Sequence, residues 1–323
     1  MFKVYVTRMI PEEGIELLKK YCEVEINPED RPLKREELLD VIKDKDAVVT
    51  QLNEKVDAEF FDSAKNLKIV ANYAVGFDNI DLKEATKRKI YVTNTPDVLT
   101  NATAELAWAL LFAAARRVIE ADKFTREGKF TGWAPNLFLG KAVTGKTLGV
   151  IGAGRIGQAF AKMSKGFDMK ILYTANTPKE EFEKETGAKY VDLETLLKES
   201  DFVSLHVPLT PHTRHLIGEK ELKLMKKTAI LINTARGPVV DEKALVNALK
   251  NKDIYAAGLD VYEKEPEITE ELKALDNVVI LPHIGSATDE ARRDMAVLVA
   301  QNIIDVIEGR TPRTLVNKDI LEK

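Results

Sequence analysis

The fold of this chain follows from one stretch, Thr147-Leu148-Gly149-Val150-Ile151-Gly152-Ala153-Gly154-Arg155-Ile156-Gly157. Its first five residues fit a short, mostly apolar strand, and the spacing G-x-G-x-x-G then leads into a helical pattern. In that context the first glycine makes a tight turn, the second lets a pyrophosphate approach the backbone, and the third lets helix and strand pack closely. The free N–H groups at the start of the helix also attract phosphate. The stretch therefore predicts a Rossmann dinucleotide-binding domain.

Strand and helix patterns alternate on both sides of this stretch. Strands are expected at 3–7, 23–26, 46–51, 67–71, 90–93, 147–151, 170–174, 201–207, 229–234, 256–261 and 278–281. Helices are expected at 12–21, 35–43, 58–64, 82–89, 102–126, 156–166 and 289–308. Such alternation is typical of parallel sheets covered by helices on both faces. We therefore predict an α/β protein with two doubly wound parallel-sheet domains, one flavodoxin-like and one Rossmann-like, and a cleft between them.

The segment that joins the two patterns carries its own prediction. Asn101 can cap the helix 102–126, whose first half is apolar on nearly every side, so we expect it to lie between lobes or subunits. The segment 128–146 has little periodicity and fits a long loop. A homodimer formed through 101–145 follows from these two features. The final helix is long enough to return to the first domain, which predicts one domain from 1–100 with 288–323 and another from 101–287.

Composition excludes several classes of protein. A chain of 323 residues is about two domains by the usual size of ~150 residues each. The net charge of −4 argues against a broad nucleic-acid-binding surface, and a single cysteine excludes a disulfide framework. The longest apolar run, 106–115, is too short for a membrane span, and the first residues lack a signal-peptide pattern. We expect a cytoplasmic protein with no nucleic-acid or membrane partner.

Three polar residues lie at or just after the ends of expected strands of the second domain, namely Arg236, Asp260 and His283. Because ligands bind at the carboxyl ends of strands in such sheets, these residues are candidates for a site. Arg236 comes after a strongly apolar strand and before a Gly-Pro turn, so it should emerge on the ligand side. Glu265 taken alone fits a solvated loop charge, and a single histidine such as His283 is commonly structural.

The other histidines give no metal site. His206 falls inside an expected strand, which favours a structural role. His212 and His215 have the spacing H-x-x-H, but no carboxylate or third histidine lies close by in the sequence. We therefore expect no bound metal.

The cofactor type depends on the end of the strand 170–174. Dinucleotide-binding domains that prefer NAD usually carry an acid there, which binds the ribose 2′-hydroxyl. Ala175 follows Thr174 here, and no arginine is present, so only Asn176, Thr177 and Lys179 could bond a 2′-phosphate. Either NAD(H) or NADP(H) fits, with a slight preference for NADP(H); a plain solvated turn fits as well.

The glycine motif with Arg236, Asp260, Glu265 and His283 resembles the D-isomer-specific 2-hydroxyacid dehydrogenase family. The resemblance covers essentially the whole chain and includes the segments 72–81, 94–105, 231–241 and 258–266. The segment Gly132-Trp133-Ala134-Pro135 is most similar to the glyoxylate/hydroxypyruvate reductase branch. The resemblance implies that the discontinuous first domain binds substrate and the second binds NAD(H) or NADP(H).

The resemblance also implies an activity and a catalytic set. The reaction is reduction of a small 2-keto acid, glyoxylate or hydroxypyruvate being favoured, to the 2-hydroxy acid. His283 is then the general acid and base, and Glu265 holds the imidazole and favours its charged form. Arg236 binds the substrate carboxylate and polarises the ketone. The implied substrate-binding residues are Asn53, Val75, Gly76, Arg236 and His283.

By the same resemblance, Asp260 bonds the nicotinamide carboxamide, and Trp133 reaches the active site of a partner subunit. Lobe closure is expected around 94–103 and 286–292. The implied cofactor-binding residues are Thr103, Gly152, Gly154, Arg155, Ile156, Gly157, Asn176, Thr177, Val207, Pro208, Thr213, Thr234, Ala235, Arg236, Asp260, His283 and Gly285.

Three alternatives stay open from the sequence. Phosphoglycerate dehydrogenases perform the same chemistry, although many carry an extra regulatory domain that is not expected here. Phosphite dehydrogenases share the Arg–Glu–His set. Carboxyl-terminal binding protein corepressors use the fold as a cofactor-sensing docking module, against which the intact catalytic set argues.

Overall fold

The computed structural model describes residues 1–322, and they form two compact units. Unit 1 comprises Met1–Leu99 together with the chain from Ser286 onward, and unit 2 comprises Thr100–Gly285. The division thus falls after Leu99 and Gly285, where the sequence places it after residues 100 and 287. In the part of the chain that the structure describes, no helix combines the length and apolar composition needed to cross a membrane.

Unit 1 contains a five-stranded parallel sheet with the order β2-β1-β3-β4-β5. This is the flavodoxin-like order, in which the first and third strands lie side by side at the switch point of the sheet. The predicted fold of the first domain is therefore confirmed, with each strand close to its expected position. The strands are β1 (Lys3–Val6), β2 (Glu23–Ile26), β3 (Ala47–Thr50), β4 (Ile69–Asn72) and β5 (Tyr91–Thr93).

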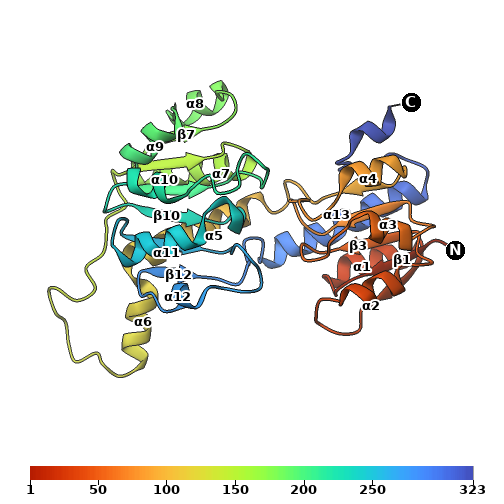
Figure 1. Ribbon diagram of the computed structural model, residues 1–323, viewed down its shortest axis with the longest axis horizontal. Helices are drawn as coiled ribbons and strands as arrows, with labels where there is room; N and C mark the ends of the chain where they lie inside the picture. The colour runs from red at the N-terminus through yellow and green to blue at the C-terminus, as the bar shows by residue number, and fades with distance from the viewer. Residues whose placement is uncertain (323) are drawn as a thin grey trace. The chain divides into compact units, whose positions relative to one another are not determined.

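The final long helix, α13 (Asp289–Ile307), belongs to unit 1, where it packs against α1 (Glu12–Lys19) and β4 (Figure 1). The helices approach closely at Gly14, because a Cβ there would lie 2.5 Å from the Ala296 carbonyl oxygen. After α13 the chain is extended, and Leu315 pairs antiparallel with Thr93. The other helices of the unit are α2 (Arg35–Val41), α3 (Ala58–Ser63), α4 (Leu82–Lys87) and the short η3 (Lys318–Leu321).

Unit 2 contains a seven-stranded parallel sheet with the order β12-β11-β10-β9-β6-β7-β8. This order places the first and fourth strands of the unit, β6 and β9, side by side, as in a Rossmann domain, and confirms that prediction. Only the short strand β8 has no counterpart in the sequence analysis. The strands are β6 (Thr147–Ile151), β7 (Lys170–Thr174), β8 (Lys189–Tyr190), β9 (Phe202–Leu205), β10 (Ile230–Asn233), β11 (Ala256–Leu259) and β12 (Val278–Ile280).

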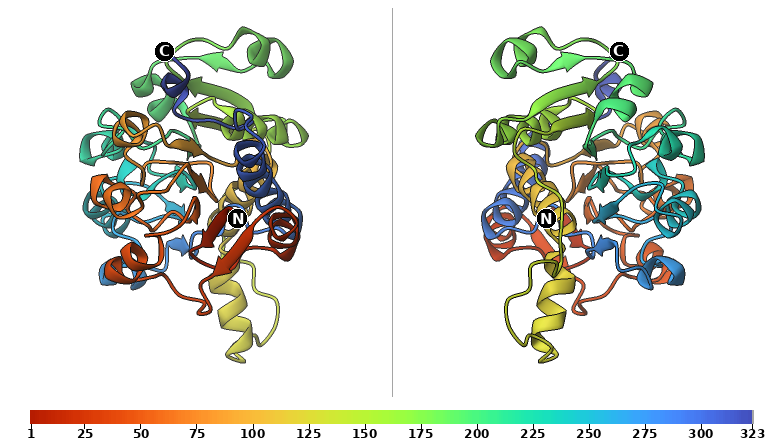
Figure 2. Two further views of the ribbon diagram at one scale, coloured as in Figure 1. Left: turned by 90° about the vertical axis from the view of Figure 1, so that its right-hand side faces the viewer. Right: turned by 90° about the vertical axis from the view of Figure 1, so that its left-hand side faces the viewer.

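The expectation of one helix over 102–126 is wrong. It is two helices, α5 (Thr100–Arg116) and α6 (Val118–Arg126), because Arg117 adopts a left-handed backbone with φ of 54°. The apolar α5 packs within unit 2 on β10, β11 and α7 (Arg155–Met163), while its place between lobes or subunits stays a prediction. Helix α6 and the loop that follows it extend away from the rest of unit 2 (Figure 2).

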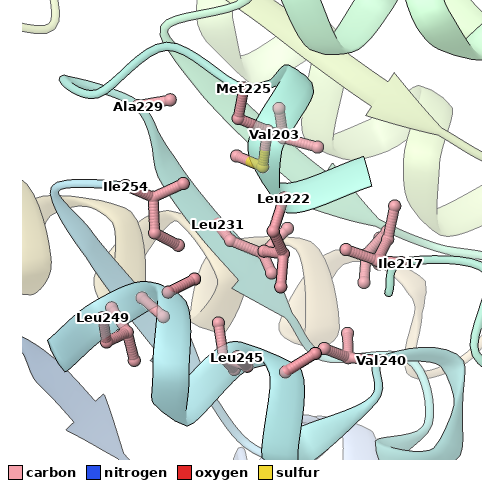
Figure 3. Close-up of a cluster of buried hydrophobic side chains, with 14 of the residues drawn as sticks. Val203, Ile217, Leu222, Met225, Ala229, Leu231, Val240, Leu245, Leu249 and Ile254 are labelled. Carbon is pink, nitrogen blue, oxygen red and sulfur yellow. The ribbon is translucent and has the colours of Figure 1, made fainter. Parts of the chain in front are cut away.

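A tightly packed core fixes the strand ends of unit 2. Side chains from β9, β10, α10 (Glu219–Leu224) and α11 (Glu242–Lys250) meet there, and Val203, Leu222, Leu231, Leu245 and Leu249 are buried (Figure 3). Each such side chain contributes about 1.5–3 kcal/mol when fully buried. The remaining elements of unit 2 are η1 (Ser164–Phe167), α8 (Glu180–Thr186), α9 (Leu193–Glu199), η2 (Gly237–Val239) and α12 (Glu270–Lys273).

Candidate active site

The glycine motif forms the turn between β6 and α7 and leaves room for a phosphate group. Gly152 has a φ of 98°, and a Cβ there would lie 2.8 Å from the His206 backbone, so only glycine fits. A Cβ on Gly157 would lie 2.1 Å from the Gly152 carbonyl oxygen, which explains its role in packing. A Cβ on Gly154 would meet no atom within 4 Å. The open side of the turn at Gly154 therefore fits the pyrophosphate of a dinucleotide.

His283 and Glu265 form a close pair at the same edge of the sheet. Glu265 lies in the loop after β11 and His283 follows β12, and the His283 Nδ1 atom is 2.7 Å from Oε2 of Glu265. The other carboxylate oxygen, Oε1, accepts a hydrogen bond of 3.0 Å from the Tyr262 N–H. Because Nδ1 is engaged, Nε2 is the ring nitrogen that can exchange a proton with a substrate.

The charge of Glu265 is set by two opposing effects. Burial raises the pKa of its carboxyl, but the hydrogen bond with His283 and the charges of His283 and Arg236 outweigh burial and hold the pKa below its ordinary value. The side chain therefore stays ionised into acid solution. An ionised carboxylate at this distance stabilises an imidazolium ring and fixes its orientation.

The backbone at His283 is held in an uncommon conformation by its neighbours. Its φ is 56°, the left-handed region that costs a non-glycine residue about 1–2 kcal/mol. The next N–H, that of Ile284, donates to Oδ1 of Asp260 at 2.7 Å. On the other side, the Tyr262 hydroxyl donates to the Leu281 carbonyl at 2.7 Å. These bonds stabilise the turn that presents the imidazole.

Asp260 has a buried carboxyl group, and its two oxygens differ in their hydrogen bonding. Its Oδ2 atom lies beside Gly285 and Thr103 and makes no hydrogen bond of good geometry among residues 1–322. Burial is the main reason that the pKa of Asp260 is raised. The buried Thr234 hydroxyl also has no partner within this range. Orphaned polar atoms of this kind fit a ligand with amide and hydroxyl groups, as the nicotinamide end of a dinucleotide has.

Arg236 reaches the same edge through a tight turn. Asn233 at the end of β10 donates from Nδ2 to the Arg236 carbonyl at 3.0 Å, and Arg236 donates from Nη1 to the Ala235 carbonyl at 2.8 Å. A Cβ on Gly237 would lie 1.8 Å from the Tyr262 carbonyl oxygen, so the turn packs directly against the segment that leads to Glu265. The glycine thus brings the guanidinium into the neighbourhood of the His283–Glu265 pair.

The loop after β9 lies beside the glycine turn. His206 is expected inside a strand, but β9 ends at Leu205. This expectation is therefore wrong by one residue, a margin typical of strand ends. The His206 Nε2 atom is 2.9 Å from the Ser204 hydroxyl, and burial lowers the pKa of the ring to about 3. The Pro208 carbonyl accepts a hydrogen bond of 2.6 Å from the Thr213 hydroxyl. A Cβ on Gly152 would lie 2.8 Å from the Val207 side chain.

The end of β7 carries no carboxylate. Asn176 and Thr177 are exposed there, and the Lys179 Nζ atom lies 3.4 Å from the Thr177 hydroxyl. The Tyr190 hydroxyl of β8 donates a hydrogen bond of 3.1 Å to the Ala175 carbonyl. The structure thus presents small polar groups at the position where the ribose would lie. Arg155 and Ile156 open helix α7 next to it.

His212 and His215 differ in their surroundings. His212 is exposed, and the Nε2 atom of His215 is 2.7 Å from Oε1 of Glu263. Among residues 1–322 the structure brings together no group of three or more metal-binding side chains.

The expected substrate-binding residues of unit 1 lie in the loops after β3 and β4. Asn53 is exposed, and the Val75–Gly76 turn is held by the side chains of Asn94 and Asn72, which donate hydrogen bonds of 2.8 Å to its two carbonyls. The roles of these asparagines could not be predicted from the sequence, because only the fold shows which carbonyls they reach. Trp133, in the loop after α6, is 86% exposed.

Comparisons with known proteins identify the family of this chain. Residues 108–285 match the family described as "D-isomer specific 2-hydroxyacid dehydrogenase, NAD binding domain". A glyoxylate reductase of Thermococcus litoralis is 59% identical over 323 residues, covering 99% of this chain and 98% of its own. The crystal structure of a glyoxylate reductase from Paecilomyes thermophila has a TM-score of 0.87 and 34% identity, with 98% of each chain covered. A structure of an NADPH-dependent glyoxylate/hydroxypyruvate reductase from Sinorhizobium meliloti, in complex with NADP and malonate, has a TM-score of 0.86 and 32% identity, covering 98% of this chain and 96% of its own.

Proposed function

We propose, from the premise that the chain belongs to the D-isomer-specific 2-hydroxyacid dehydrogenase family, that it reduces a small 2-keto acid to the corresponding 2-hydroxy acid. The observation that carries this proposal is the 2.7 Å pair of His283 and Glu265 at the ligand edge of a dinucleotide-binding sheet. Glyoxylate and hydroxypyruvate are the favoured substrates, since relatives at 59% and 32% identity carry those names.

The residues of unit 2 supply the steps that the reaction requires. A reduced nicotinamide, when bound, would supply the hydride for the carbonyl carbon. His283 donates a proton from Nε2 to the carbonyl oxygen, so that the reduced carbonyl becomes an alcohol. Glu265 stabilises the imidazolium before that transfer and orients the ring afterwards. General acid catalysis of this kind contributes about 10²–10⁴-fold to the rate.

Binding of the substrate requires a cation and backbone donors for its carboxylate. Arg236 has a planar guanidinium that matches a carboxylate with two parallel hydrogen bonds and also draws electrons from the adjacent ketone. In unit 1 we assign Asn53 and the N–H groups of the Val75–Gly76 turn to binding of a substrate carboxylate. In the reverse reaction, His283 acts as the base that removes the proton from the hydroxyl.

The cofactor is a nicotinamide dinucleotide, and the residues that fit it lie along the carboxyl edge of the unit 2 sheet. We propose a slight preference for NADP(H), supported by the absence of a carboxylate at the end of β7 and by the exposed Asn176 and Thr177. Asp260 is assigned to the carboxamide through its orphaned Oδ2. The other assigned residues are Thr103, Gly152, Gly154, Arg155, Ile156, Gly157, Val207, Pro208, Thr213, Thr234, Ala235, Arg236, His283 and Gly285.

We also propose a homodimer formed through residues 101–145. Support comes from large apolar side chains exposed on α6 and its loop, including Ile119, Phe130, Trp133 and Leu139. Several large apolar side chains exposed within one segment are a feature of protein interfaces. Trp133 is proposed to reach the active site of the partner subunit. A cytoplasmic location stays a prediction from composition.

A substrate panel tests the proposal directly. Small 2-keto acids, 3-phosphohydroxypyruvate and phosphite (the last with oxidised cofactor) are offered with both nicotinamide dinucleotides, and turnover is followed by absorbance of the reduced ring. We expect turnover of glyoxylate or hydroxypyruvate, and a higher kcat/KM with NADPH than with NADH. Cofactor binding without turnover of any of these compounds would instead favour a docking module of the corepressor type.

Substitution of His283 tests the assigned acid. We expect that His283→Ala lowers kcat by about 10²-fold or more while cofactor binding is retained. His212→Ala is the matched control, because His212 is an exposed histidine of the same unit. Near-normal turnover by His283→Ala would contradict the assignment of the acid.

A further inference from the structure

The loops that follow β3 and β4 in unit 1 are joined by two asparagine side chains. These loops lie at the carboxyl edge of the sheet, next to the place where β1 and β3 are adjacent, which is the switch point of this topology. The first loop, 51–54, carries Asn53, and the second carries the Val75–Gly76 turn. The proposed function assigns both loops to the substrate carboxylate.

Asn79 closes the first loop. Its Nδ2 group donates one hydrogen bond to the Gln51 carbonyl and another to the Glu54 carbonyl, each of 3.0 Å. The two acceptors are the first and last residues of the loop, so a single amide fixes the distance between its ends. Glu54 adds a second tie, because its buried carboxyl accepts a hydrogen bond from the Gln51 N–H.

Asn72 closes the second loop and connects it to the first. Its Nδ2 group donates to the Gly76 carbonyl at 2.8 Å and lies 3.4 Å from Oδ1 of Asn79. Its Oδ1 atom accepts a hydrogen bond of 2.9 Å from the Thr50 hydroxyl, at the end of β3. Asn72 is fully buried, so its amide has no water to replace a lost partner.

We propose that Asn79 and Asn72 are positioning residues for substrate binding, which hold the 51–54 loop and the Val75–Gly76 turn in one fixed register. Each amide offers two donors, and together the four donor positions serve the Gln51, Glu54 and Gly76 carbonyls and the contact between the two asparagines. Asn53 and the N–H groups of the turn then meet one carboxylate with correct spacing. This inference rests on the proposed function, because it takes the substrate from there.

The test compares Asn79→Ala with a matched control, Asn317→Ala. Asn317 is a buried asparagine of the same unit that also ties main-chain groups, accepting from the Val92 N–H at 2.9 Å and donating to the Ile90 carbonyl at 2.9 Å. Its bonds lie at the start of β5, away from the 51–54 loop. Asn79→Asp is the second variant, because it keeps the shape of the side chain but turns the donor toward the carbonyls into an acceptor.

Steady-state kinetics and hydrogen exchange give two separate readouts. We expect Asn79→Ala to raise the KM for glyoxylate about 10- to 100-fold, since a displacement of about 1 Å costs that much in a positioned site. The Kd for NADPH should change less than about twofold. Hydrogen exchange of the peptides that span 51–56 and 75–81 should accelerate together in this variant and stay at the wild-type rate in Asn317→Ala. If Asn79→Ala does not fold, Asn79→Asp is expected to give the same KM increase.

The outcomes separate this inference from the proposed function. A wild-type protein that turns over no 2-keto acid would refute the function, whereas exchange in the two peptides would still report on the coupling of the loops. An unchanged KM in a folded Asn79 variant would overturn the positioning role. A KM increase of equal size in Asn317→Ala would also overturn it, because the effect would then be one of general stability. Acceleration in only one of the two peptides would refute the fixed register.

Discussion

Replacement of Glu265 by glutamine isolates the charge of the carboxylate that holds His283. Glutamine keeps the length of the side chain and an oxygen that can accept from Nδ1–H, but it carries no charge. In the wild-type protein the His283 Nδ1 atom is 2.7 Å from Oε2 of Glu265. A hydrogen bond between charged groups contributes about 1.5–3 kcal/mol, and one between neutral groups about 0.5–1.5 kcal/mol. The Glu265 and His283 side chains are 35% and 28% exposed, so we take the lower part of that difference, about 1 kcal/mol.

The loss falls on the protonated imidazole, because only that form interacts with the negative charge. About 1 kcal/mol corresponds to a factor of about five in a rate constant. Reduction uses the imidazolium ring as its acid, and the ring loses this stabilisation in the variant. Glu265→Gln should therefore lower kcat/KM for glyoxylate reduction about fivefold, which steady-state kinetics at one fixed pH measures.

The lowered pKa of Glu265 gives the stability of the folded state a pH dependence with a defined sign. The hydrogen bond and charge of His283, against the opposing effect of burial, lower the pKa of Glu265. The stabilisation of the folded state by this pair is therefore present above the ordinary pKa of a glutamate carboxyl. It is lost as pH falls through the lowered pKa of Glu265. Glu263→Gln is the matched control, since Glu263 pairs with His215 at the same 2.7 Å outside the site. A kcat/KM that is identical in wild type and Glu265→Gln would refute the reasoning.

Three further predictions concern other residues of unit 2. Arg236→Lys should lower kcat/KM about 10- to 100-fold, because one charge-assisted hydrogen bond is lost, and kinetics with unchanged values would contradict the bidentate role. Gly157→Ala should lower Tm more than Gly154→Ala, since only the first puts a Cβ 2.1 Å from a carbonyl oxygen, whereas Gly154→Ala should weaken cofactor binding; calorimetry and titration together check both effects. Tyr262→Phe should lower both Tm and kcat, because it leaves the Leu281 carbonyl unpaired beside the imidazole turn; unchanged values of both would show that this bond is dispensable.

The sequence predicts the regular parts of the fold because apolar periodicity and glycine spacing are local properties. It fails where one residue departs from its usual behaviour. The break between α5 and α6 occurs at Arg117, which adopts a left-handed backbone without being glycine, so no residue type marks it. Strand β8 has only two residues, Lys189 and Tyr190, which is too short for an alternating pattern.

The candidate site divides in the same way. The place of Arg236, Asp260 and His283 at one edge of the sheet could be predicted, because each lies within three residues after a strand and strand ends share one edge of a parallel sheet. The hydrogen bonds that hold the loops of the two candidate sites could not be predicted. The Asp260–Ile284 bond joins residues 24 positions apart, and the Asn79–Gln51 bond joins residues 28 apart. Such bonds depend on loop conformations that local pattern does not encode.

The return of α13 to unit 1 has a consequence for the order in which the chain matures. Unit 2 is continuous, so all of its residues are synthesised before α13. The segment 1–99 has to wait for α13, which supplies the surface that α1 and β4 pack against. At about 5–20 residues per second this delay is on the order of ten seconds or more, during which the apolar face of α1 is open to chaperones. The amino-terminal part of the chain is thus made first and finished last.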